Sequence, residues 1–393
     1  MTASAPEADA VRPTTVPMAA PMAAPIAAPM TAGTHGFPIA MPVLSRGSAD
    51  RSEDLRDQTR IAAAWGTARV LTVDRDGRTG VRTTPDGVTL ASRPATDLGA
   101  APPPGAVLLG TVPNDAGSNA LSDRPDALWD QPAGGATLPQ AALPVGNSPS
   151  PGEFPWAGEY AAAIDGVDYW AIGADLDLGE LAAATGPETP DAAALRDVGA
   201  LLSDTDAGLL TAAVAVLNWH RHGSFCPRCG SPSVVQSAGW SRLCSNGHQE
   251  FPRTDPAVIV LVHDGADKMV LARQATWPTG RVSVLAGFTE AGESLEGTVS
   301  REILEEVGLH VTDIGYLGSQ PWPFPRSLMV GFTAKAQPGA PLFPRAGEIE
   351  AAQWVDRATV RRALEAGGTS DGISLPPSIS IARRMIEGWA ALD

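Results

Sequence analysis

Residues 287–309 read GFTEAGESLEGTVSREILEEVGL, and their second half raises a physical question. If that half is helical, Glu302 shares one face with Glu305 and Glu306, three and four residues further along. Like charges at these spacings destabilise a helix by about 0.2–0.5 kcal/mol per pair. No Lys or Arg stands four residues after any of the three. Such a run is usually a solvated helix face, so the neighbouring residues must decide whether it is a site.

The residues around the three glutamates favour a metal site. Ile303, Leu304 and Val307 form an apolar side of the predicted helix, with the carboxylates beside it. A glycine-bounded loop brings a fourth acid, Glu293, to the helix start. Hard divalent cations such as Mg²⁺ bind through carboxylates together with substrate phosphates. They can activate water and offset charge on a diphosphate, so binding them would relieve the repulsion.

The whole segment resembles the Nudix box, G-x5-E-x7-R-E-U-x-E-E-x-G-U, where U is aliphatic. Every specified position is matched, at Gly287, Glu293, Arg301, Glu302, Ile303, Glu305, Glu306, Gly308 and Leu309. The resemblance implies a hydrolase that cleaves a nucleoside diphosphate linked to another group, with Mg²⁺ or Mn²⁺. It implies Glu302, Glu305 and Glu306 as metal ligands or base, and Arg301 as the ion-pair support of the carboxylates.

A second motif, SQPWPFPRS at 319–327, narrows the predicted substrate. Its prolines stiffen the backbone and its aromatics offer flat surfaces for a heterocyclic base. A rigid packing loop between strands is the alternative interpretation. The motif is similar to the signature of the NADH pyrophosphatase branch of the Nudix family. The substrate contacts implied are Gln320, Pro321, Trp322, Pro323, Phe324, Pro325, Arg326 and Ser327.

A third motif predicts a structural zinc site. Cys226-x2-Cys229 is followed, after fourteen residues, by Cys244-x3-His248, which is the paired-ligand spacing of a zinc ribbon. Asn246 stands where a second C-x2-C pair would place its Cys, so His248 is the expected fourth ligand. Free thiols at a decayed site are the alternative. His220 and His222, at the end of a predicted helix, are expected at the surface rather than among the ligands. With only three clustered Cys, a reducing, cytoplasmic location is expected.

Composition limits the other possibilities. The 393 residues are 44% hydrophobic and carry a formal net charge of −16, which argues against a broad nucleic-acid surface. The sequence contains no run of 18 apolar residues, so a membrane span is not expected. The Pro-Met-Ala-Ala repeat at 17–31 lacks the basic start and unbroken apolar core of a signal peptide.

We predict an α+β fold with five parts. In chain order these are a disordered low-complexity tail (1–42), a β-rich N-terminal domain (43–190), a helical connector (191–223), a zinc ribbon (224–252) and a Nudix hydrolase domain (253–393) that forms an α/β/α sandwich on a mixed sheet. A Pro/Gly-rich insertion at about 113–156 is expected to be a loop.

Periodicity predicts the main elements. Strands are expected at 68–73, 87–92, 106–112, 159–164, 168–173, 257–263, 268–273, 330–336 and 353–355. Helices are expected at about 191–202, from just after the capping run 203–206 to about 222, across the acidic segment, and at 378–391. In the last of these, Ile381, Met385, Ile386 and Trp389 share one side.

The NADH pyrophosphatase resemblance covers about residues 43–393 and implies further site residues. Ala286 is expected to offer its carbonyl to a metal, and Glu348 to be a distal metal ligand, with Glu350 as its competitor. The implied substrate contacts are Phe288, Phe251 from a second subunit, Arg196 and the backbone of Ala382. A homodimer is implied.

The predicted activity is metal-dependent hydrolysis of NADH or NAD⁺ to AMP and nicotinamide mononucleotide. Removal of NAD caps from RNA 5′ ends by the same chemistry is the main alternative. Hydrolysis of another dinucleotide, such as ADP-ribose, is disfavoured by SQPWPFPRS. A nucleotide-sensing binding protein with an inactive domain is a further alternative, disfavoured because no glutamate of the box is lost.

Overall fold

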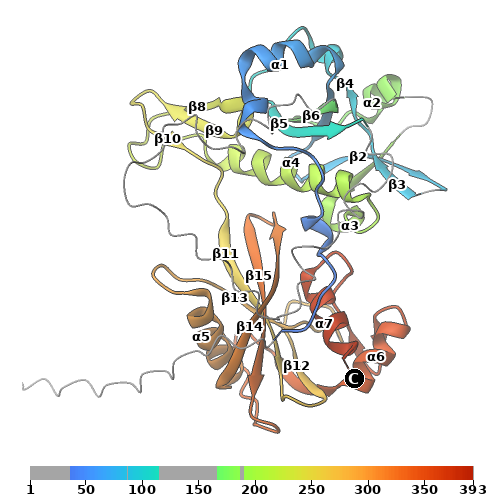
Figure 1. The fold of residues 1–393 in the computed structure, drawn as a ribbon, viewed down its shortest axis with the longest axis vertical. Helices are drawn as coiled ribbons and strands as arrows, with labels where there is room; N and C mark the ends of the chain where they lie inside the picture. The colour runs from blue at the N-terminus through green and yellow to red at the C-terminus, as the bar shows by residue number, and fades with distance from the viewer. Residues whose placement is uncertain (1–35, 86, 115–165, 186–189, 393) are drawn as a thin grey trace, which may run out of the picture. The chain divides into compact units, whose positions relative to one another are not determined.

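The computed structural model describes residues 36–85, 87–114, 166–185 and 190–392, which belong to one compact unit, Thr34–Asp393. The predicted strand at 159–164, residues 1–35 of the predicted tail and nearly all of the 113–156 insertion lie outside the described residues. Figure 1 shows the arrangement of the elements. Among the described residues, no helix is long and apolar enough to cross a membrane.

The N-terminal part is built on a seven-stranded sheet with the path β3-β2-β1-β6-β5. Its strands are β1 (Arg69–Val73), β2 (Arg78–Thr84), β3 (Gly87–Leu90), β4 (Arg93–Pro94), β5 (Val107–Pro113), β6 (Gly166–Gly173) and β7 (Asp191–Ala194). The predicted strands at 68–73, 87–92, 106–112 and 168–173 are confirmed as β1, β3, β5 and β6. The helices beside this sheet are α1 (Gln58–Ala64) and α2 (Leu178–Thr185).

The long helix α4 (Asp204–His222) packs on this sheet, and its start is capped by the Ser203 side chain, which accepts a hydrogen bond from the Asp206 amide. Leu209, Leu210 and Leu217 of α4 join the core formed with the strands. The predicted helix at 191–202 was wrong. Residues 191–194 instead pair with β2 as strand β7, and only Leu195–Val198 form a short helix, α3. Pairing with a neighbouring strand here overrides the helix propensity of an alanine-rich segment.

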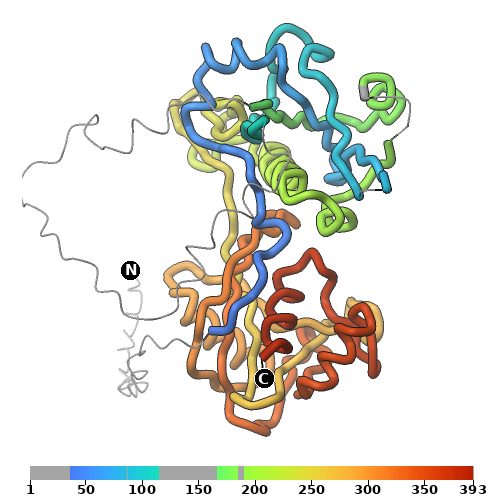
Figure 2. Tube along the Cα trace, turned by 45° about the vertical axis from the view of Figure 1, so that its right-hand side comes forward, coloured from blue at the N-terminus to red at the C-terminus, as the bar shows by residue number. Residues whose placement is uncertain are grey.

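Residues 36–42, predicted to belong to a disordered tail, instead pack on the C-terminal part. Phe37 is 8% exposed and lies in the same apolar core as Leu317 and Trp389. Ser45, just beyond, donates a hydrogen bond from its hydroxyl to the Ser319 carbonyl at 2.8 Å. Figure 2 shows this N-terminal segment (blue) beside β14 and β15 (orange). The apolar side chains of the segment explain its order, because they bury surface on folding.

A small three-stranded sheet, ordered β10-β9-β8, follows α4. Its strands are β8 (Ser233–Gln236), β9 (Ser241–Cys244) and β10 (Gln249–Glu250). The turn before β8 carries Cys226 and Cys229, and the turn between β9 and β10 lies between Cys244 and His248.

The C-terminal part has a six-stranded mixed sheet with the path β14-β15-β11-β12-β16, and β13 pairs with β11. Only β11 and β15 run parallel; the other pairs are antiparallel. The strands are β11 (Asp255–His263), β12 (Lys268–Arg273), β13 (Leu285–Phe288), β14 (Val311–Trp322), β15 (Ser327–Ala336) and β16 (Ala351–Asp356). The predicted strands at 257–263, 268–273, 330–336 and 353–355 are confirmed. A separate two-stranded ribbon joins β17 (Thr369–Ser370) to β18 (Ile373–Ser374).

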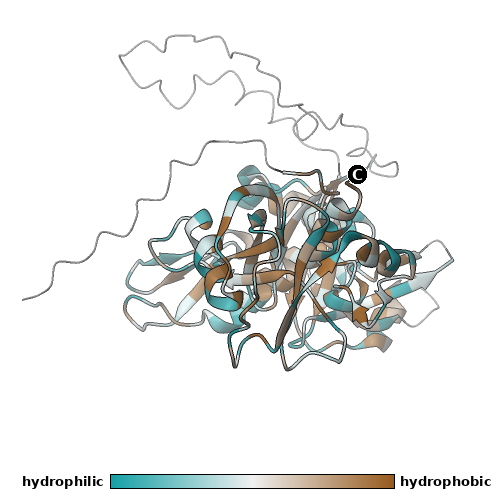
Figure 3. Ribbon diagram, turned by 90° about the horizontal axis from the view of Figure 1, so that it is seen from below, coloured by the Kyte–Doolittle hydropathy of each residue, from teal (hydrophilic) through white to brown (hydrophobic). Residues whose placement is uncertain are grey.

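Helices cover both faces of this sheet, as Figure 1 shows, with α5 (Leu295–Val307) on one side and α6 (Arg357–Glu365) and α7 (Ile381–Ala390) on the other. Strand β11 supplies both cores by alternation: Val258 packs with α5, and Ile259 with α6 and α7. Figure 3 shows hydrophobic residues (brown) along the interior strands. The α/β/α sandwich on a mixed sheet is confirmed, and so is the buried side of α7.

Candidate metal and substrate site

Helix α5 begins and ends at the residues that the sequence favours. The Ser294 side chain caps its start by accepting a hydrogen bond from the Gly297 amide. Gly308 ends it in the left-handed conformation, at φ 73°, which glycine adopts without a steric penalty. Leu304, predicted on the apolar side, is 43% exposed, so the buried side of α5 is carried by Val299, Ile303 and Val307.

Arg301 holds the acidic residues of α5 and of the preceding loop together. Its Nε and Nη2 bind the two oxygens of Glu293 at 2.6 and 2.8 Å, and its Nη1 binds Glu302 Oε1 at 2.9 Å. Nη2 also donates to the Phe288 carbonyl at 3.0 Å. The Arg301 guanidinium lowers the pKa of Glu293 to about 2. Arg301 also reaches Glu305 Oε2 at 3.5 Å, so Glu305 has a cationic partner four residues N-terminal to it.

Glu302 and Glu306 are buried, at 8% and 2% exposure. The pKa of Glu306 is raised to about 8, mainly by burial and to a smaller extent by the charges of Glu302 and Glu348. Burial also raises the pKa of Glu302. Glu306 Oε2 has no hydrogen-bond partner among the described residues, which is costly for a buried polar atom.

The glycine that opens the motif allows this burial. A β-carbon added at Gly287 would lie 1.9 Å from Cδ of Glu302, so the carboxylate rests directly on the β13 backbone. The neighbouring Ala286 amide donates a hydrogen bond to Glu306. In an antiparallel strand the N–H and C=O groups of one residue point to the same side. The Ala286 carbonyl should therefore face the acids, as its amide does.

The structure separates the two candidates for the distal acid. Glu350 forms an ion pair with Arg273. Glu348 is close enough to Glu302 and Glu306 for its charge to raise the pKa of both. The donor set therefore consists of carboxylates with one unsatisfied buried oxygen, which suits a hard divalent cation. These ligand assignments stay predictions.

The four predicted zinc ligands are brought together. One ligand atom each from Cys226, Cys229, Cys244 and His248 lie within 4.8 Å of one another. Cys229 and Cys244 Sγ are 3.8 Å apart, and Cys226 Sγ lies 3.6 Å from His248 Nδ1. Tetrahedral zinc with bonds of about 2.3 Å to sulfur and 2.0–2.1 Å to nitrogen gives edges of roughly these lengths. The cluster therefore fits a structural zinc ion.

Residues around this cluster explain two features of the sequence. Asn246 donates from Nδ2 to Cys229 Sγ at 3.4 Å, so it supports a ligand rather than being one. His220, expected at the surface, is half-buried, and its Nε2 and the Gly239 carbonyl are hydrogen-bonded at 2.9 Å. Burial lowers the pKa of His220 to about 4, so it is neutral at neutral pH. His222 is exposed, and neither histidine belongs to the four-ligand cluster.

The SQPWPFPRS motif forms the tip of the β14–β15 hairpin, with Gln320, Pro321 and Trp322 in strand β14. Gln320 is fully buried. Its Nε2 donates to the Ile379 carbonyl at 2.7 Å, and its Oε1 accepts from the Ile381 amide. Gln320 therefore positions the start of α7, and its amide is engaged within the chain.

The aromatic residues at the tip contact Arg196 of the short helix α3. Its guanidinium lies 4.1 Å from the Phe324 ring centre and 5.6 Å from that of Trp322. Burial lowers the pKa of Arg196, and the charge of Arg281 lowers it further. Arg196 beside two aromatic rings, with the charge of Arg281 nearby, forms a surface suited to an anionic, aromatic ligand.

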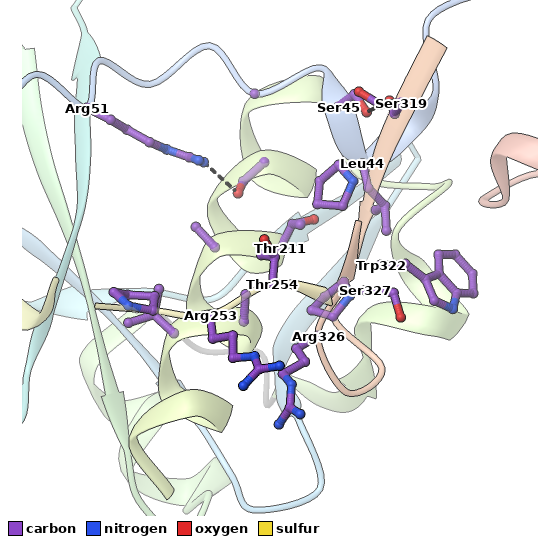
Figure 4. Close-up of a pocket in the computed structure, with 18 of the residues that line it drawn as sticks. Leu44, Ser45, Arg51, Thr211, Arg253, Thr254, Ser319, Trp322, Arg326 and Ser327 are labelled. Carbon is purple, nitrogen blue, oxygen red and sulfur yellow. Dashed lines mark hydrogen bonds between the residues drawn. The ribbon is translucent and has the colours of Figure 1, made fainter. Parts of the chain in front are cut away.

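The other side of the tip lines a cavity of about 510 Å³ (Figure 4). Trp322, Pro323, Arg326 and Ser327 contribute to it, together with residues of α4 and of the 44–51 segment. None of the box glutamates lines this cavity. It is therefore separate from the acidic cluster, and we assign the chemistry to the acids.

Three remaining predicted contacts differ in exposure. Phe251 and Phe288 are 64% and 57% exposed, which is unusual for phenylalanine and leaves both free to contact a ligand or a second subunit. Ala382 is buried, and its amide donates to the capping Ser380 hydroxyl at 3.2 Å. Their roles in substrate binding stay predictions.

Comparison with known proteins identifies the family. Residues 253–373 match the NUDIX domain, and residues 221–251 match the NADH pyrophosphatase zinc ribbon domain. The chain is 42% identical over 361 residues to the NAD-capped RNA hydrolase NudC of Mycobacterium tuberculosis, covering 90% of this chain and 96% of that protein. The chain belongs to the NADH pyrophosphatase branch of the Nudix hydrolases.

Two mammalian relatives match about half of this chain. The mouse mitochondrial NAD(P)H pyrophosphatase NUDT13 is 41% identical over 205 residues, which are 50% of this chain and 58% of that protein. The human NAD-capped RNA hydrolase NUDT12 is 37% identical over 202 residues, which are 49% and 43% of the two chains.

Sequence reasoning missed two cationic residues of this Nudix site. Arg281 approaches Arg196 closely enough to affect its pKa, and Arg345 pairs with Glu305 at 3.3 Å. Both lie outside the recognised motifs, so only the folded chain brings them to the site.

Proposed function

We propose that this Nudix hydrolase cleaves the diphosphate bond of NADH or NAD⁺, giving AMP and nicotinamide mononucleotide. The observation that carries the proposal is the buried Glu306 carboxylate, with an unsatisfied oxygen and a pKa raised to about 8. Such a group is unfavourable in the chain alone and becomes favourable beside a divalent cation. The full-length similarity to an NAD-capped RNA hydrolase supports the same bond as the target.

The predicted metal ligands are Glu302, Glu305, Glu306, Glu348 and the carbonyl of Ala286. Mg²⁺ or Mn²⁺ bound there would polarise the diphosphate and lower the pKa of water. Arg301 holds Glu302 and Glu293 in fixed positions. Glu305 is the exposed acid among Glu302, Glu305 and Glu306, which supports it as the proposed acceptor of a proton from water. One water is consumed, one phosphorus–oxygen bond of the diphosphate breaks, and two monophosphate dianions form with release of two protons.

Arg196 and the aromatic tip support recognition of a nicotinamide dinucleotide. Arg196 and Arg281 offer positive charge, and the Phe324 and Trp322 rings offer flat surfaces. The exposed Phe288 is proposed to stack on a base, with Phe251 of the partner subunit on the other face. A homodimer is therefore part of the proposal, as is zinc in the ribbon. A reducing, cytoplasmic location is proposed from the three thiol ligands.

Removal of the NAD cap from RNA is the second candidate. It is favoured because the mycobacterial relative, which is similar over 90% of this chain, is named an NAD-capped RNA hydrolase. The net charge of −16 disfavours long contacts with the RNA body, so recognition would be confined to the cap.

The test is product chromatography with NADH, NAD⁺, ADP-ribose and NAD-capped RNA, in Mg²⁺ and in Mn²⁺. The proposal predicts AMP with nicotinamide mononucleotide from the dinucleotides, and 5′-monophosphate RNA from the capped RNA. Glu305→Gln should reduce all cleavage by at least about 10²-fold. Consumption of ADP-ribose with NADH left intact would sink the proposal, and full activity in Glu305→Gln would remove the role of that residue.

A further inference from the structure

The loop before Glu348 is anchored on the C-terminal end of the acidic helix. The Phe343 amide donates to the Val307 carbonyl and the Arg345 amide to the Glu306 carbonyl, both at 2.9 Å. The last carbonyls of a helix lack intrahelical partners, so these two bonds satisfy groups that would otherwise need water. The backbone of Arg345 is therefore fixed beside the predicted metal ligands.

The Arg345 side chain points along the same edge. Its Nη1 lies 3.3 Å from Glu305 Oε2, and its Nε lies 3.8 Å from Glu348 Oε2. Both partners are predicted metal ligands, one from α5 and one from the loop before β16. One guanidinium therefore bridges the two ligands that are most exposed to solvent.

Arg345 differs from Arg301, the other arginine of the cluster. Arg301 is 24% exposed and is held by Glu293 on two sides and by the Phe288 carbonyl. The Arg345 side chain is 54% exposed, and its ion pairs at 3.3 and 3.8 Å are longer. Exposed pairs of this kind are weak, so a divalent cation can displace Arg345 more easily than Arg301.

We infer that Arg345 is an internal counter-ion that occupies the solvent side of the metal site until a divalent cation displaces it. The inference rests on the proposed function, because it needs Glu305 and Glu348 to be metal ligands. In the metal-free chain the guanidinium offsets their repulsion. When metal binds, the same oxygens turn to the cation, and Arg345 is released. Arg345 therefore competes with the metal and lowers its affinity.

The test measures Mn²⁺ binding to the full chain by loss of the electron paramagnetic resonance signal of free Mn²⁺. Arg345→Gln should bind Mn²⁺ about two- to five-fold more tightly, because an exposed ion pair no longer has to be broken. Arg345→Lys keeps the charge without the two-pronged geometry. Its Mn²⁺ affinity should therefore lie between those of wild type and Arg345→Gln. Arg362→Gln is the matched control, since Arg362 is similarly exposed and pairs at 2.9 Å with Asp371, outside the predicted site.

A second measurement separates competition from a merely structural role. In EDTA, Arg345→Gln should melt at a lower temperature than wild type. Saturating Mn²⁺ should remove that difference, because metal replaces the lost cation. An unchanged or weaker Mn²⁺ affinity in Arg345→Gln would overturn the inference. If wild type itself binds no Mn²⁺, the proposed metal site fails instead, so the two failures are distinguishable.

Discussion

Replacing Gly287 by alanine tests the close contact on which the buried carboxylate depends. The added β-carbon would lie 1.9 Å from Cδ of Glu302 and 2.2 and 2.3 Å from its oxygens. Carbon atoms in contact lie about 3.5 Å apart, so the gap must open by roughly 1.6 Å. Strand β13 is held by its pairing with β11, in which Gly287 faces Val258, so the carboxylate must move. Its 2.9 Å bond to Arg301 would then break.

The expected consequences of Gly287→Ala are large for activity and moderate for stability. Overpacking costs about 1–3 kcal/mol. Displacing a catalytic group by about 1 Å can cost on the order of 10²-fold in rate. The assay is kcat for NADH cleavage with thermal melting, beside Gly66→Ala, whose added β-carbon meets nothing within 4 Å. If Gly287→Ala keeps kcat within about twofold of wild type, the reasoning from this contact is refuted.

Three other predictions concern separate parts of the molecule. The pKa of Glu306 is raised to about 8 in the folded chain, so between pH 4.5 and 8 the unfolded carboxylate ionises first. The metal-free protein should therefore lose stability on the order of 5 kcal/mol as the pH rises through this window. Melting in EDTA from pH 5 to 9 should show this loss for wild type and not for Glu306→Gln; parallel curves would contradict it. His248→Cys should retain about one zinc per chain by elemental analysis, because a Cys₄ set also closes a tetrahedral site. His248→Ala should lose that zinc. Equal zinc contents in the two variants would exclude His248 as a ligand. Arg196→Ala should raise KM for NADH about tenfold, because a charged contact is lost. Steady-state kinetics with Arg196→Lys as the control would measure this rise in KM. An unchanged KM in Arg196→Ala would contradict a contact between Arg196 and the substrate.

The acidic helix and the Cys/His cluster could be predicted because their signals are local. The spacing of Glu302, Glu305 and Glu306 follows from helix geometry, and the Cys226–Cys229 and Cys244–His248 pairs are each close in sequence. The sandwich was predicted from strands that alternate with helices along 253–393, and the burial of both faces of β11 agrees with it.

What the sequence did not reveal depends on contacts between distant segments. The alanine-rich 191–194 segment became strand β7 because β2 was available to pair with it. Gln320, expected as a substrate contact, has its amide engaged by the backbone at the start of α7. Arg345 reaches Glu305 across 40 positions of the chain, which no spacing rule anticipates.

The central claim is that this Nudix hydrolase breaks a diphosphate bond with a divalent metal, and hydrolysis of NADH in ¹⁸O-labelled water tests it most directly. We predict equal amounts of AMP and reduced nicotinamide mononucleotide, with ¹⁸O in one of the two phosphates. We also predict no cleavage in EDTA and recovery when Mg²⁺ or Mn²⁺ is restored. Full activity in EDTA, or release of free nicotinamide with ADP-ribose, would contradict the account.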